Sequence, residues 1–105
     1  MTAVEIVSGL ADTARAASRT LSAATGAERK AALEAIAAAI ESRSAEIIAA
    51  NEFDMAVARK DQMHPQMRDR LLLTPERISA MAGGARQVAA LPDPLGNTLR
   101  ESTLP

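Results

Sequence analysis

The chain has 105 residues and a formal net charge of -1, and 48% of its residues are hydrophobic although only one, Phe53, is aromatic. This length fits one domain or a piece of a larger one. The balanced charge offers no basic surface for nucleic acid or anionic lipid, and the absence of cysteine excludes disulfides, a thiolate nucleophile and zinc–thiolate sites. We therefore expect no nucleic-acid partner, no membrane partner and no bound metal.

The apolar content and the N-terminus point to a helical chain in the cytoplasm. Much of the apolar fraction is alanine, which favours helix but buries little area per contact, so we expect a helical layer that packs on something else. Glu5 and Asp12 interrupt the region where an export signal needs a basic segment and an unbroken apolar run. No stretch approaches the ~20 apolar residues that span a bilayer.

The first predicted helix covers Val4–Ala24. Its charged residues, Asp12, Arg15 and Arg19, fall outside an apolar stripe with helical spacing. The stripe consists of Val4, Val7, Leu10, Ala11, Ala14, Ala17 and Leu21.

Capping signals predict the next two helices. Thr25, with Glu28 at the third helical position, fits a capping box at the start of a helix over Ala27–Glu41. Serines at 42 and 44 can cap a new start, which predicts a break there and a third helix over Ser44–Lys60.

Prolines delimit the remaining helices. We expect a loop over 61–66, because Pro65 pushes His64 out of helical geometry, and then a short helix, Gln66–Leu72. Thr74 as cap and Pro75 at the first helical position predict a fifth helix, Pro75–Ala90. Gly83 and Gly84 inside it cost roughly 1 kcal/mol each relative to alanine, and we expect close packing against a neighbour to explain them, with a hinge as the alternative.

The segment after Pro92 predicts a turn and then the start of a strand. Residues 92–96 end the helix, and residues 98–103 alternate weakly, with Leu99 between β-branched threonines. A single strand has no ladder partner. Its mate would have to come from other sequence.

No residue carries a convincing catalytic, cofactor-binding or metal-binding signal. His64 is the only histidine and fits a solvated loop residue. Asn51, Glu52 and Asp54 could form an acid/base or metal cluster, but a helix kink or cap in which Asn51 bonds nearby backbone is favoured. Gly83-Gly84 follows no strand and has no GxGxxG pattern. The catalytic, cofactor and metal sets predicted for this chain are therefore each empty.

The stretch from Asp69 to Asn97 closely resembles one part of the gamma-glutamyl phosphate reductases, also called glutamate-5-semialdehyde dehydrogenases, of the aldehyde dehydrogenase superfamily. The resemblance covers essentially the whole chain. Its most specific positions are Arg70-Leu71, Leu73-Thr74-Pro75 with Arg77, Arg86-Gln87-Val88 and Asp93-Pro94-Leu95-Gly96.

The resemblance implies a mainly α chain that forms the helical N-terminal layer of an α/β aldehyde-dehydrogenase-like nucleotide-binding domain. Residues 1–96 would be that layer, and residues 97–105 the truncated start of a strand. The implied partner is the remainder of the reductase chain. We also expect self-association through exposed apolar helix faces.

The implied activity is NADPH-dependent reduction of L-glutamyl 5-phosphate to L-glutamate 5-semialdehyde, in proline biosynthesis. In this family a cysteine thiolate accepts the acyl group and hydride then reduces the thioester. Because the chain has no cysteine, we expect it to be inactive alone and to bind no NADPH. The alternative is a self-contained helical protein-interaction module.

Overall fold

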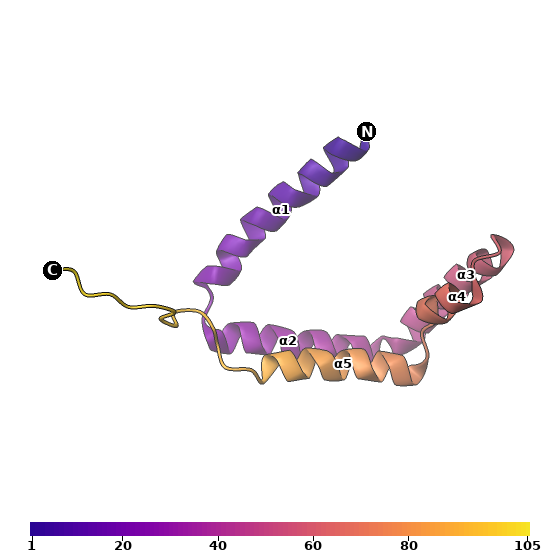
Figure 1. Cartoon of the computed structure of the whole chain (residues 1–105). Coiled ribbons are helices and arrows are strands. Elements are labelled where there is room, and N and C mark those ends of the chain that lie inside the picture. Colours follow the sequence, from indigo (N-terminus) through magenta and orange to yellow (C-terminus); the bar gives the residue numbers. More distant parts are fainter.

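The computed structural model describes all residues 1–105 and contains five helices and no strand (Figure 1). Each helix lies within one residue of its predicted bounds at both ends, which confirms the mainly α prediction. The helices are α1 (Ala3–Ala23), α2 (Gly26–Ser42), α3 (Ser44–Lys60), α4 (Pro65–Leu71) and α5 (Pro75–Ala89).

The molecule is open rather than globular. Its radius of gyration is 19.5 Å, whereas a compact chain of this length has a value of about 13 Å. In Figure 1, α2 and α5 lie side by side, α3 and α4 form a second pair beyond a bend, and α1 projects away alone. None of the helices combines the length and apolarity needed to cross a membrane.

The α2–α5 pair holds most of the small core. Ala37 on α2 and Ala82 on α5 are fully buried, and Ile78 is the one large side chain that is almost completely enclosed. Because alanines meet at this interface, the helix backbones can approach closely. Only seven residues of the whole chain are buried, so little apolar area is removed from water.

The predicted caps are largely confirmed. Thr25 and Glu28 form a complete capping box at α2, and the Thr74 hydroxyl accepts a hydrogen bond from the Arg77 amide at α5. A second capping box, formed by Thr2 and Glu5, starts α1 and was not predicted.

The serine cap predicted for α3 is wrong. Arg43 occupies the N-cap position, and no side chain caps the helix. The Ser42 hydroxyl instead donates to the Ala39 carbonyl within α2, because a serine in the last turn of a helix can bond back to that turn.

The strand predicted over residues 98–103 does not form. Residues 97–105 contain no helix or strand and are exposed, as expected where the chain supplies no second strand to complete a ladder. The explanation offered for Gly83 and Gly84 is also wrong for this chain. A Cβ built at either glycine meets no atom within 4 Å.

Candidate functional site

The residues with catalytic or metal-binding chemistry lie apart from one another. His64 is exposed and caps α4, with its Nδ1 accepting from the Gln66 amide at 3.2 Å. Glu52 and Asp54 point from α3 to solvent as exposed residues. The structure contains no group of three or more His, Cys, Asp or Glu side chains that could hold a metal ion.

Asn51 is the one buried polar residue, and it fastens the linker between α4 and α5. Its side chain is 5% exposed. Its Nδ2 donates to the Leu71 carbonyl and its Oδ1 accepts from the Leu73 amide, both at 2.8 Å. The prediction that Asn51 bonds backbone is confirmed, but it neither kinks nor caps its own helix, because its partners lie 20 and 22 residues away in sequence. Asn51 therefore anchors the linker that leads into α5, whereas Thr74 and Pro75 start the helix itself.

Arg29 joins three segments at the other end of the α2–α5 pair. Its Nη1 donates to the Ala24 carbonyl and, at 3.1 Å, to the Leu21 carbonyl at the end of α1. Its Nη2 pairs with Asp93 Oδ2 at 2.7 Å. One guanidinium therefore caps the C-terminus of α1 and ties it to the proline-rich exit of α5. Its planar fork of donors suits it to several acceptors at once.

Asp93 presses against the first residue of α2. A Cβ built on Gly26 would lie 2.6 Å from Asp93 Oδ2, so only glycine leaves room for the carboxylate there. Beside this contact lies a groove of about 730 Å³, bounded by the start of α2 and the end of α5. Its lining includes the apolar residues Leu33, Val88 and Leu91 and the charged residue Lys30.

Arg86 on α5 forms ion pairs with residues of α2. It pairs with Glu41 and more loosely with Glu34, at 3.8 Å. The hydrogen bond from Arg86 lowers the pKa of Glu41, and the same bond raises the pKa of Arg86. Because solvent screens ion pairs between exposed groups, these contacts align the helices rather than hold them together.

Sequence reasoning missed these joints. Arg29 and Asp93 lie 64 residues apart, and Arg86 and Glu41 lie 45 apart. No local pattern connects residues at such separations. The only available signal was an arginine in the first turn of a helix, where the dipole disfavours a cation and where a partner is therefore needed.

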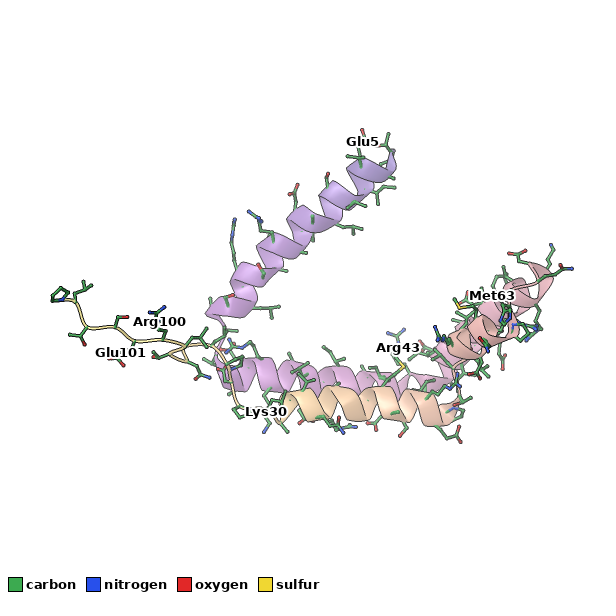
Figure 2. The ribbon with its side chains drawn as sticks, viewed as in Figure 1. Glu5, Lys30, Arg43, Met63, Arg100 and Glu101 are labelled. Atoms are coloured by element: carbon green, nitrogen blue, oxygen red, sulfur yellow. The ribbon has the colours of Figure 1, made fainter.

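The largest exposed surface without a partner in the chain is apolar. α1 has no buried residue, and Val7 and Leu10 are 63% and 66% exposed. Figure 2 shows its side chains projecting along the whole helix, with Glu5 near the free end, and no other element beside them. On the α2–α5 pair, Ile36, Met81 and Val88 are also about half exposed. These side chains form apolar surfaces that no other part of the chain covers.

Comparison with known proteins gives three relatives of the same name, gamma-glutamyl phosphate reductase. The protein from Gluconobacter oxydans (strain 621H) is 50% identical over 91% of this chain and 22% of its own length. The Kineococcus radiotolerans protein is 46% identical over 99% of the chain and 24% of its length. The Geobacillus thermodenitrificans protein is 47% identical over 90% of this chain and 23% of its own length. No protein-family model and no solved structure matches.

The chain therefore spans about a quarter of the length of the curated relatives it matches. The matches cover nearly the whole of this chain. The family indicated by the Asp69–Asn97 stretch is confirmed as a match to one segment of these reductases.

Proposed function

We propose that this chain, which corresponds to one segment of the gamma-glutamyl phosphate reductases, is a structural part of such an enzyme and has no reductase activity alone. The observation that carries the proposal is 46–50% identity over 90–99% of the chain to three proteins of that name. The whole enzyme would use NADPH to reduce L-glutamyl 5-phosphate to L-glutamate 5-semialdehyde in proline biosynthesis.

The role of the segment would be to form a helical layer beside a nucleotide-binding domain of the aldehyde dehydrogenase type. Three features support this role: a small alanine-based core, half-exposed apolar side chains on α2 and α5, and polar residues engaged in joints between helices. The exposed faces of α2 and α5 would be covered by the remainder of the reductase chain. Residues 97–105 would gain their strand partner from it as well.

The chemical step would depend on that remainder. Acyl transfer from the phosphate in this family needs a thiolate nucleophile, and this sequence has no cysteine. The contribution of the segment would be to hold the chain around the active site in place. Its own side chains would not contact the substrate or NADPH.

A chimera tests the proposal. The 104 residues of the Kineococcus radiotolerans reductase that align with this chain would be replaced by it. Glutamate-5-semialdehyde, phosphate and NADP+ would then be supplied and the formation of NADPH followed. We expect the chimera to be active and the isolated chain to be inactive.

The matched control replaces the same residues with a helical segment of equal length and unrelated sequence, which should abolish activity. A chimera that is folded but inactive would refute the proposed role. Saturable binding of NADPH to the isolated chain by calorimetry, at micromolar concentrations, would refute the claim that the segment holds no cofactor site.

The alternative, a self-contained helical interaction module, is favoured by one observation, the full exposure of α1. It predicts that the chain binds a partner unrelated to the reductase and that the chimera fails.

A further inference from the structure

We propose that Arg29 is a latch that fixes the direction of α1 and couples it to the turn that follows α5. The latch lies entirely within this chain, so it would act whether or not the proposed reductase role holds. A two-residue elbow, Ala24 and Thr25, joins α1 to α2, and both of its residues have extended backbone. No residue of α1 is buried, and the helix projects away from the others (Figure 1). The direction of α1 is therefore set at the elbow and not by packing.

Every backbone polar group of the elbow has a hydrogen-bond partner. The Ala24 amide donates to the Thr20 carbonyl, and the Thr25 amide donates to the Glu28 carboxylate, both at 3.1 Å. The Thr25 carbonyl accepts from the Arg29 amide at 3.1 Å, and the Ala24 carbonyl accepts from the Arg29 side chain. Exposed connections whose backbone is bonded only to water open easily. Arg29 prevents this here by supplying the partners of both elbow carbonyls.

The Arg29 side chain also reaches the last turn of α1. Its Nη1 donates to the Leu21 carbonyl at 3.1 Å. A guanidinium at this place satisfies carbonyls that a helix leaves without partners, and it lies at the negative end of the helix dipole. A swing of α1 about the elbow would break the bonds to Leu21 and Ala24. One side chain on α2 therefore resists rotation of α1.

Asp93 holds the other edge of the same guanidinium. Its Oδ2 accepts from Arg29 Nη2 at 2.7 Å, and its Oδ1 accepts from the Leu95 amide at 3.0 Å. Both carboxylate oxygens are thus engaged, and the flanking Pro92 and Pro94 restrict the backbone that carries them. Because the guanidinium is planar and rigid, fixing one of its edges limits the freedom of the other.

Gly26 provides the space for this contact. A Cβ at this position would lie 2.6 Å from Asp93 Oδ2. Gly26 lies in α2 and its φ is not positive, so its backbone conformation does not require glycine. The glycine is needed because the carboxylate approaches the start of α2 so closely.

One guanidinium therefore couples two segments that lie far apart in sequence. Arg29 and Asp93 are 64 residues apart, and the coupling is reciprocal: displacement of Asp93 favours release of α1, and movement of α1 weakens the hold on the turn. The two side chains are 21% and 41% exposed. A partly exposed ion pair shifts populations by up to about fivefold. The turn also lines the groove of about 730 Å³, so a change there would reach α1 through Arg29.

Two spin labels measure the direction of α1 in the full chain, because the parent has no cysteine of its own. Ser8→Cys and Ser79→Cys place exposed labels on α1 and α5, and double electron–electron resonance gives the distribution of distances between them. We expect one narrow distribution in the parent. Arg29→Met, which keeps an unbranched side chain but removes its donors, should broaden the distribution. Lys30→Met, the same loss of charge at the exposed neighbour, is the control and should leave it unchanged.

Asp93→Ala tests the coupling from the other end. Residue 93 lies outside every helix, yet its loss should raise the population of other α1 directions by up to about fivefold. High salt, which screens the ion pair, should broaden the distribution of the parent toward that of Asp93→Ala. In the reverse direction, the order parameter of the Leu95 amide, measured by NMR relaxation, should fall in Arg29→Met and stay unchanged in Lys30→Met.

Several outcomes would overturn the latch. A broad distribution in the parent would mean that α1 has no fixed direction. An unchanged distribution in Arg29→Met, or equal broadening in Lys30→Met, would mean that the guanidinium contacts do not set it. Broadening in Arg29→Met without any in Asp93→Ala would overturn the coupling to the turn after α5. Circular dichroism checks that the helices persist, and if Arg29→Met loses them, Asp93→Ala and the salt dependence decide.

Discussion

Removing the amide of Asn51 is the sharpest single test of how the second half of this chain is held together. Asn51→Ala deletes both 2.8 Å hydrogen bonds, to the Leu71 carbonyl and from the Leu73 amide. Asn51 is the only buried polar side chain of the protein, so no second buried side chain can take over these two bonds. The linker that places α5 after α4 would then be held by packing and by the exposed Arg77 guanidinium, which donates to the Leu72 carbonyl at 2.7 Å and pairs with Asp69 at 3.1 Å.

The expected magnitude follows from the two groups left without partners. A buried backbone group that loses its hydrogen bond costs about 1–3 kcal/mol. Leu71 and Leu73 are only half-buried, so the lower part of that range applies to each. The free energy of unfolding should fall by about 2–3 kcal/mol. That is a large share of the total in a chain that buries seven residues.

Urea denaturation followed by circular dichroism measures this loss, with Glu52→Ala as the matched control on the exposed side of the same helix. The control should change the free energy by less than ~0.5 kcal/mol. Hydrogen exchange at the Leu73 amide gives a local readout, since that proton should exchange much faster in Asn51→Ala. Asn51→Asp should be intermediate, because a carboxylate can accept from Leu73 but cannot donate to Leu71.

A loss indistinguishable from that of Glu52→Ala, or unchanged protection of the Leu73 amide, would refute the reasoning. Either result would mean that the α4–α5 linker does not depend on the buried amide.

Two further predictions concern the start of α2. Gly26→Ala should lower the free energy of unfolding by up to about 1 kcal/mol by displacing Asp93 from Arg29. In an Asp93→Ala background the same substitution should be neutral or stabilising. A double-mutant cycle measured by urea denaturation that shows no coupling between the two positions would contradict the contact. The hydrogen bonds of Thr25 lower the pKa of Glu28 below 4.5, so the Glu28 carboxyl group binds a proton less tightly in the folded state than in the unfolded state. The stability that Glu28 contributes is therefore present above pH 4.5 and is lost as the pH falls through the folded pKa. Thr25→Ala removes the hydroxyl that accepts from the Glu28 amide and should cost about 1 kcal/mol near neutral pH. The backbone amide of residue 25 still donates to the Glu28 carboxylate, so the carboxyl titration followed by NMR should move only part of the way toward its ordinary range; a complete return to that range would rule out the backbone hydrogen bond as the main cause.

The sequence by itself determined the helices and their ends. Local signals sufficed: the Thr25–Glu28 capping box, the Thr74-Pro75 start and the proline-rich exit after Ala90 act within a few residues of the boundary that they set. The family was equally readable, because the ordered residues of the Asp69–Asn97 stretch cannot arise from alanine content alone. The start of α3 was predicted at the right residue but for the wrong reason, since no serine caps it.

Only the tertiary structure decided which helices meet. α1 has the most regular apolar stripe in the chain, yet it packs on nothing here, whereas α2 and α5 pair across more than forty residues of sequence. Amphipathic spacing shows which face of a helix is apolar but carries no information about the partner of that face. The joints made by Arg29 and Asn51 were likewise invisible, because each depends on backbone or side-chain groups that folding brings together from distant segments. The missing strand has the same cause, since backbone hydrogen bonds in a sheet need a second segment to supply them.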